Sequence, residues 1–165
     1  MSDVTPFPPH VGAEFLLWLW YRAEIGDASI QLRTGRIKLW LDDRMVFRTP
    51  SDEKPTVVLT ASEGAKREAL TSLHSGKVLS ELRIAFQKDE RDYYATLDTV
   101  LTVRNLQLPQ VLSETLGEAV VDRLFLYDEF SQILRGAFSE FCALRKDTPK
   151  FGKALSAWTD VQSWP

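Results

Sequence analysis

The residues that could support acid–base or metal chemistry are few and far apart in this chain. Neither His10 nor His74 has a Cys, His or Glu at the spacing of a zinc site, which needs several such ligands. His74 is expected in the last turn of a helix, where a positive charge is favourable. Cys142, the single cysteine, lies on or beside an apolar helical stripe and is interpreted as a buried thiol. These residues do not indicate a metal centre.

Paired carboxylates are the other feature that could suggest catalysis. They occur at Asp42–Asp43, Asp52–Glu53, Asp89–Glu90 and Asp128–Glu129, mostly at predicted turns, where acids are usually solvated. There is no nucleophile elbow, phosphate-binding glycine loop or dinucleotide fingerprint. We therefore predict a protein that is not an enzyme and uses no cofactor. A metal-dependent nuclease stays open as the alternative enzyme class, because scattered carboxylates can converge in space.

Composition places the chain among globular intracellular proteins. Its 165 residues suit one domain, and its formal charge of -3 gives no overall attraction to nucleic acid or membrane. One cysteine permits no intrachain disulfide, which suits a reducing compartment. The N-terminus does not resemble a signal peptide, and the longest apolar run, Phe15–Tyr21, is too short to span a bilayer. We expect a cytoplasmic location.

Positive charge is concentrated in the first predicted hairpins and around the middle helix. Such local clusters can contact phosphates without reading sequence, although an ordinary charged sheet face is the alternative interpretation. Tyr93 and Tyr94 stand beside Lys88 and Arg91 and could stack on bases, but packing in the core is the favoured explanation. The candidate nucleic-acid contacts are Arg33, Arg36, Lys38, Lys66, Arg67, Lys77 and Arg83.

The first half of the chain predicts a buried helix followed by hairpins and a second helix. Period-two alternation from Arg36 to Leu41 places the basic residues on one face of a strand. Thr60 with Glu63 forms a predicted capping box for a helix that ends near His74 and Gly76. The predicted elements are a helix at 11–25, strands at 29–33, 36–41 and 44–48 with turns at Thr34-Gly35 and Asp42-Asp43, a strand at 56–59 and a helix at 60–74.

The second half predicts three more strands and one long helix. The strands are expected at 78–87, 93–97 and 100–106. The helix from Ser113 to about Arg145 carries an apolar stripe at three- and four-residue steps. The stripe comprises Leu116, Val120, Leu124, Tyr127, Phe130, Leu134, Phe138, Phe141 and Leu144.

Hairpins dominate over helical crossovers, so we predict an α+β fold with antiparallel strands packed against a buried N-terminal helix, a middle helix and a long C-terminal helix. The expected organisation is an extended arm at 1–10, one domain at 11–146 and a tail at 147–165 with Trp158 and Trp164.

Four segments in this order resemble the C-terminal half of the recombination-associated RdgC family. They are EFLLWLWYRAE (14–24), LHSGKVLSELRIAF (73–86), YYATLDTVLTVRNLQLP (93–109) and DRLFLYDEFSQILRGAFSEF (122–141). The resemblance covers roughly residues 13–145 and depends on the order and spacing of the segments, because none of them is diagnostic alone. The N-terminal half of the family pattern has no counterpart in this chain.

The resemblance implies an α+β protein that binds double-stranded DNA without sequence preference, associates with the nucleoid and limits access of the RecA recombinase. It also implies a ring-shaped homodimer, or here another homo-oligomer or a complex with a full-length relative. Its implied DNA contacts are Lys66, Arg67, Lys77 and Arg83. The strand at 56–59 departs from the pattern because it contains no basic residue.

Two functions therefore remain open. The first is a non-specific duplex-DNA-binding protein, and the second is a protein-interaction or assembly module that retains the fold without DNA binding. A continuous basic surface between the first hairpins and the middle helix would favour DNA, whereas a broken one would favour assembly.

Overall fold

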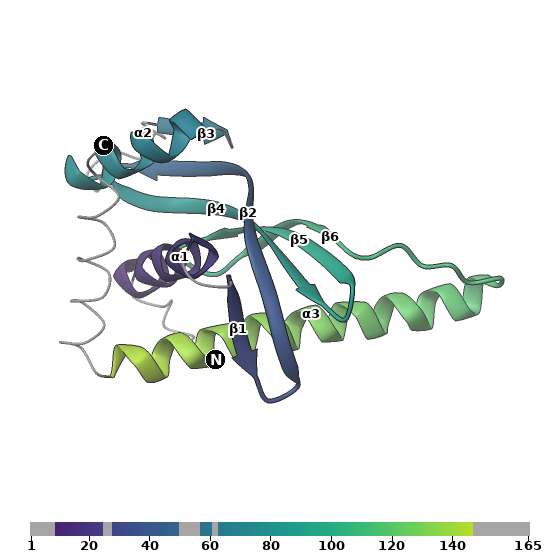
Figure 1. Ribbon diagram of the computed structural model, residues 1–165. Coiled ribbons are helices and arrows are strands. Elements are labelled where there is room, and N and C mark those ends of the chain that lie inside the picture. The colour runs from purple at the N-terminus through teal and green to yellow at the C-terminus, as the bar shows by residue number, and fades with distance from the viewer. Residues whose placement is uncertain (1–8, 25–27, 50–56, 61–62, 147–165) are drawn as a thin grey trace, which may run out of the picture.

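The computed structural model describes residues 9–24, 28–49, 57–60 and 63–146. Within these ranges three helices alternate with groups of antiparallel strands, which confirms the predicted α+β class and the predicted order of elements (Figure 1). The elements are α1 (Pro9–Glu24), β1 (Ser29–Leu32), β2 (Gly35–Arg48), β3 (Val57–Thr60), α2 (Glu63–His74), β4 (Val78–Lys88), β5 (Arg91–Asp98), β6 (Val103–Gln107) and α3 (Leu116–Arg145).

The described strands form one sheet in the order β1-β2-β4-β5-β6, and β3 also pairs with β2. The long strand β2 accommodates both β1 and β3, because β1 pairs with its first residues and β3 with residues 44–47. The predicted turn at Asp42-Asp43 is wrong. The strand continues there with a register shift between Leu41 and Met45, since an irregularity in the β2–β4 pairing takes up these residues without ending the strand.

One face of the sheet packs against the helices and the other, called the outer face below, points away from them. On β2 the buried Ile37 and Leu39 alternate with the exposed Arg36 and Lys38, which confirms the predicted alternation. Helix α1 lies against the inner face, where Trp20 is fully buried and contacts Phe47 of β2.

Helix α1 begins at Pro9, two residues earlier than predicted. Proline suits the first turn of a helix because its missing N–H would have no intrahelical partner there. The predicted extended arm at 1–10 therefore gives up its last two residues to α1, and residues 1–8 lie outside the described ranges. So do Ile25 and Gly26, where the sequence predicts the end of this helix.

Helix α2 ends as predicted. Thr60 is the last residue of β3, where it pairs with Arg44, and the described helix starts at Glu63. Residues 61 and 62 and the side chains of Thr60 and Glu63 lie outside what the structure describes, so the predicted capping box stays a prediction. At the other end Gly76 has φ 85°, and its N–H and that of Lys77 donate to Leu73 and Ser72. This is a Schellman C-cap.

Helix α3 crosses the molecule and continues past the sheet (Figure 1). It starts at Leu116, capped by Thr115, whose side chain accepts a hydrogen bond from the Glu118 N–H. All of its buried residues lie in its C-terminal part, and no residue between 116 and 125 is buried. We call residues 116–125 the α3 arm and residues 126–145 the α3 base. None of the described helices is long and apolar enough to cross a membrane.

Candidate functional site

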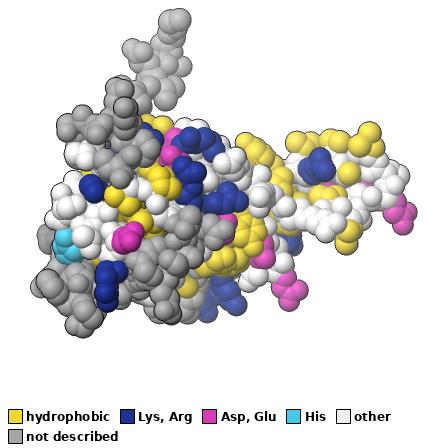
Figure 2. Space-filling model, turned by 90° about the horizontal axis from the view of Figure 1, so that it is seen from above, with side chains coloured by type: hydrophobic (Ala, Val, Ile, Leu, Met, Phe, Trp, Pro, Cys, Tyr) yellow, Lys and Arg dark blue, Asp and Glu magenta, His cyan; other side chains and the backbone are white. Residues whose placement is uncertain are grey.

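The α3 arm and the residues just before and after it expose an unusual amount of apolar surface. Of the ten large hydrophobic residues exposed in the described part of the chain, seven lie between residues 112 and 127. Figure 2 shows hydrophobic side chains along this projecting end of the molecule, interrupted by few charged ones. The seven are Leu112, Leu116, Val120, Val121, Leu124, Phe125 and Tyr127.

Most of these side chains share one side of the helix. Successive residues of an α-helix are about 100° apart around its axis. Val120 and Leu124 therefore lie roughly opposite Leu126 and Ile133, which are buried. The predicted apolar stripe is therefore only partly the packing face. Phe130 and Phe141 are buried, whereas the four members of the stripe that precede Phe130 are at least half exposed. A contiguous apolar patch of this kind marks a binding surface in most proteins that expose one.

The predicted nucleic-acid contacts do not form one surface. Arg36, Lys38 and Arg83 lie on the outer face of the sheet. The Arg83 side chain is 15% exposed, and its Nε is 2.8 Å from the Asp42 carboxylate. The same guanidinium donates to Thr96 and to the Asn105 carbonyl, so its charge and most of its donors are already engaged.

The contacts predicted around the middle helix lie on the opposite side. Arg67 is exposed on α2, which packs on the same side of the sheet as α1 through Ala69 and Leu70. Lys77 lines an apolar cavity of about 270 Å³ between α1 and α2, together with Leu17 and Leu73. The backbone of Lys66 belongs to α2, and its side chain is outside what the structure describes. The basic surface is thus broken by the sheet itself.

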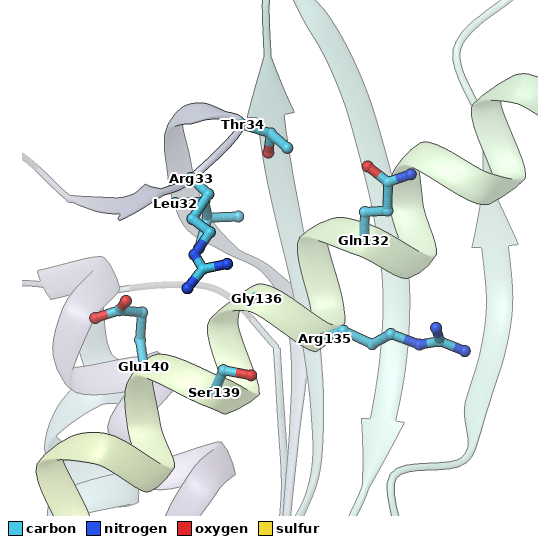
Figure 3. A pocket seen from close by; sticks show the side chains of 8 residues that line it. All are labelled: Leu32, Arg33, Thr34, Gln132, Arg135, Gly136, Ser139 and Glu140. Carbon is cyan, nitrogen blue, oxygen red and sulfur yellow. The ribbon is translucent and has the colours of Figure 1, made fainter.

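Arg33 occupies a third position, at the turn between β1 and β2. It lines a cavity of about 490 Å³ between this turn and the α3 base. The helix approaches closely because Gly136 has no side chain, and a Cβ there would be 2.9 Å from the Leu32 side chain. Figure 3 shows the Arg33 side chain above the helix and the Arg135 side chain directed away from Arg33. Glu140 lies on the side of Arg33 opposite to Arg135. The two guanidinium groups therefore do not converge on a common anion.

A buried charged cluster joins the α3 base to the β4–β5 hairpin. Glu129, only 7% exposed, accepts two hydrogen bonds from Arg91 at 2.8 and 2.7 Å and one from the Tyr93 hydroxyl at 2.5 Å. Lys88 Nζ is 3.8 Å from the same carboxylate. The Arg91 guanidinium also lies over the Phe125 ring, 5.9 Å from its centroid, where the arm meets the base.

The cluster shifts the titration of its members in opposite directions. Burial alone would raise the pKa of Glu129, but hydrogen bonds from Arg91 and Tyr93 outweigh it and hold that pKa below its usual range. Burial, and then the hydrogen bond to Glu129, raise the pKa of Tyr93. The hydrogen bond to Glu129 raises the pKa of Arg91. At neutral pH the cluster is therefore a charged, hydrogen-bonded clamp.

Sequence reasoning misses this clamp and the exposure of the arm. In the sequence Asp128-Glu129 looks like a solvated acidic pair, although Glu129 lies three residues after Leu126 and four before Ile133, on the side of the helix that packs. An acid in that position is the available signal. Tyr93 packs in the core as predicted, whereas Tyr94 points to the outer face, and Cys142 is partly buried. Within the described residues no group of three or more His, Cys, Asp and Glu side chains could hold a metal ion.

Comparison of the chain with family models, with curated proteins and with solved structures gives no match. The resemblance to the RdgC family stays a prediction from the sequence. The predicted tail, with Trp158 and Trp164, lies outside the described residues.

Proposed function

We propose that this protein is a homotypic assembly module, which pairs through the α3 arm with the arm of a second copy. The observation that carries the proposal is the apolar side of the arm, where Leu116 is 84% exposed and Leu124 is 65% exposed. Solvation of such side chains is unfavourable, and their burial contributes roughly 25 cal/mol per Å². A standard interface buries roughly 800 Å² per partner. The exposed side chains on one side of the helix, Leu116, Val120, Leu124 and Tyr127, can supply the apolar centre of such an interface.

Charge favours a second copy in parallel orientation. If Val120, Leu124 and Tyr127 form the seam between two helices, Arg123 and Asp128 lie on opposite flanks. In a parallel pair the flanking residues that meet are about five positions apart along the chain, so Arg123 of each copy faces Asp128 of the other. In an antiparallel pair the same flank of each helix faces that of the other, so the two Arg123 side chains would lie together and repel each other. The buried residues of α3 lie between 126 and 141, whereas Val120, Leu124 and Tyr127 are each at least half exposed, which leaves this seam open.

Sedimentation velocity over a wide concentration range tests the proposal. We expect a reversible dimer, and we expect Leu124→Glu to raise its dissociation constant about 30-fold or more, the scale of a hot-spot residue. Val100→Glu is the matched control, because Val100 is also half exposed but lies outside the arm. A wild-type chain that stays monomeric at several hundred micromolar would contradict the proposal.

The orientation has its own test. Arg123→Asp and Asp128→Arg should each weaken dimerisation several-fold, as exposed ion pairs are worth about 0.2–1 kcal/mol, and the double variant should restore it. Additive losses in the double variant would rule out the parallel arrangement.

Duplex-DNA binding is the second candidate, favoured by the outer face of β2. Lys38 is exposed and forms no ion pair within the described part of the chain, and Arg36 and Arg44 are exposed on the same strand. The acids among the outer-face arginines argue against it, since Asp42, Glu81 and Asp98 already pair with Arg83, Arg48 and Arg104.

A duplex titration at two salt concentrations separates this candidate from assembly. Replacing Arg36 and Lys38 by Gln should weaken binding and reduce the salt dependence, since the slope falls by about 0.9 for each phosphate that the protein no longer neutralises. Arg67→Gln, on the opposite side of the sheet, should have no effect. Equal losses from both sets would indicate attraction by overall charge and no defined duplex site.

A further inference from the structure

The outer face of the sheet carries an aromatic pair that neither candidate function uses. Trp40 of β2 and Tyr94 of β5 both stand next to Ala85 of the intervening strand β4, in register across three strands. Their ring centroids are 6.2 Å apart and their planes meet at 82°, an edge-to-face arrangement. Both side chains are partly exposed, while Ala85 beneath them is fully buried.

The edge-to-face geometry matters because it leaves ring surface available. In such a pair one ring covers a single face of the other with its edge, so one of the two rings has neither face covered by its partner. Packing over Ala85 would also be served by aliphatic side chains. The exposed part of either ring, on the solvent side of the sheet, can in addition offer an apolar face against which a nucleobase stacks.

Polar groups flank the rings, and the acids among them are engaged, since Asp42 pairs with Arg83 and Asp92 accepts from Gln87. Lys38 is exposed on the same face two residues from Trp40, and it forms no ion pair within the described ranges. Gln107 of β6 is exposed and pairs in register with Tyr94, and Gln87 pairs with Lys38. Gln87 donates to Asp92 at 2.8 Å, so its carbonyl oxygen points elsewhere. A cation for a phosphate and amides for base edges, set beside aromatic faces, are the groups that sheet surfaces use to bind single strands.

We propose that the outer face binds an unpaired nucleobase of a single-stranded nucleic acid against Trp40 and Tyr94, with Lys38 on the adjoining phosphate. This goes beyond the arm-mediated assembly and uses none of its residues. A duplex is the wrong ligand for the rings, because its bases are stacked on each other and expose only their edges. The Asp42–Arg83 ion pair lies beside the site, two residues along β2 from Trp40 and two along β4 from Ala85, and Arg83 also donates to the Asn105 carbonyl of β6.

The experiment is a fluorescence anisotropy titration of labelled oligo(dT) of about 16 nucleotides, the length that covers one such surface. Oligo(U) of the same length and an abasic strand with the same number of phosphates are measured in parallel. We expect oligo(dT) or oligo(U) to bind at least tenfold more tightly than the abasic strand. The ratio of the two base-bearing strands distinguishes DNA from RNA as the source.

Variants locate the bound base. Trp40→Leu and Tyr94→Leu keep apolar cover over Ala85 and should each weaken binding about 10- to 100-fold, whereas Tyr94→Phe should retain it. Tyr127→Leu, which removes an exposed tyrosine of the dimer seam, should leave oligonucleotide binding unchanged. Leu124→Glu should weaken dimerisation and leave oligonucleotide binding intact, so the two proposals fail separately. Equal affinity for base-bearing and abasic strands, or wild-type binding by both leucine variants, would overturn the inference.

Discussion

The two parts of α3 have similar sequences and opposite environments. The arm and the base both place a large apolar residue at almost every turn, yet Phe125 is 57% exposed and Phe130 is 2% exposed. The difference arises from what lies beside each part. The base packs against β1, α1 and the β4–β5 hairpin, whereas the arm runs past the sheet (Figure 1). Helical periodicity alone therefore does not distinguish a packing face from a binding face.

Truncating one aromatic residue in each part is the most direct way to break this comparison. Phe130→Ala should lower the free energy of unfolding by about 3–5 kcal/mol, because it opens a cavity between α3 and the rings of Phe86 and Tyr93. Phe125→Ala should cost less than about 1 kcal/mol, mainly the contact with Arg91. Urea unfolding of both variants at low protein concentration measures the difference. Equal losses would show that the arm is packed in solution.

The charged clamp allows the same comparison with acids. Glu129→Ala leaves Arg91 and the Tyr93 hydroxyl without their shared acceptor and should cost about 3–5 kcal/mol. The neighbouring Asp128 is exposed and hydrogen-bonded only to Gln132 among the described residues, so Asp128→Ala should change stability by less than about 0.5 kcal/mol. Thermal unfolding monitored by circular dichroism checks both. A small effect of Glu129→Ala would mean that water replaces the clamp.

Replacing either of two glycines of α3 by alanine should change the free energy of unfolding, with opposite signs at the two positions. Gly136→Ala would place a Cβ 2.9 Å from the terminal methyl groups of the buried Leu32. Displacing them should cost about 1–3 kcal/mol, which outweighs the ~0.5–1 kcal/mol that alanine adds to helix stability, so the protein should be destabilised. At Gly117 nothing lies within 4 Å of an added Cβ, so Gly117→Ala should stabilise the helix by about 0.5–1 kcal/mol. Chemical denaturation of the two single variants separates the signs. If Gly117→Ala destabilised the protein, another part of the chain or a second copy would have to pack against the start of the arm.

The pH dependence of stability should show the smallest effect. We expect the charged clamp of Glu129, Arg91 and Tyr93 to contribute at both ends of the pH range. The lowered pKa of Glu129 stabilises the folded state above its unfolded pKa of about 4.3, and this contribution is lost as the pH falls through the folded value. The raised pKa of Tyr93 contributes fully below about pH 10 and is lost as the pH rises above it. Glu129→Gln should flatten the acid limb, and Tyr93→Phe the alkaline limb, of a plot of unfolding free energy against pH. Unchanged limbs would show that other groups dominate.

The sequence predicts the fold well where local rules decide the structure. Alternation along β2, the glycine that ends α2 and the order of elements all follow from backbone geometry and apolar spacing. The continuous course of β2 through Asp42 and Asp43 does not, because a register shift depends on the pairing with β4. The sequence also places Thr60 at the start of the middle helix, whereas its pairing with Arg44 of β2 makes it the last residue of β3.

The candidate sites are less predictable, because each depends on contacts between distant segments. In the sequence Arg83 looks like a free cation, but Asp42, far from it along the chain, lies within 2.8 Å in the fold. The position of Glu129 on the helix is a signal, but its partners Arg91 and Tyr93 belong to a distant hairpin and are not evident from the sequence. The exposed arm cannot be separated from the packed base by sequence, since that depends on where the sheet ends relative to the helix.

Hydrogen exchange of the α3 amides at low and high protein concentration tests the central proposal most directly. If the arm pairs with a second copy, amides between residues 118 and 125 should exchange more slowly as concentration rises, while those of the α3 base remain equally protected. Leu124→Glu should remove the concentration dependence and leave the base unchanged. Arm amides that exchange at one rate over the whole concentration range, beside a fully protected base, would contradict assembly through the arm.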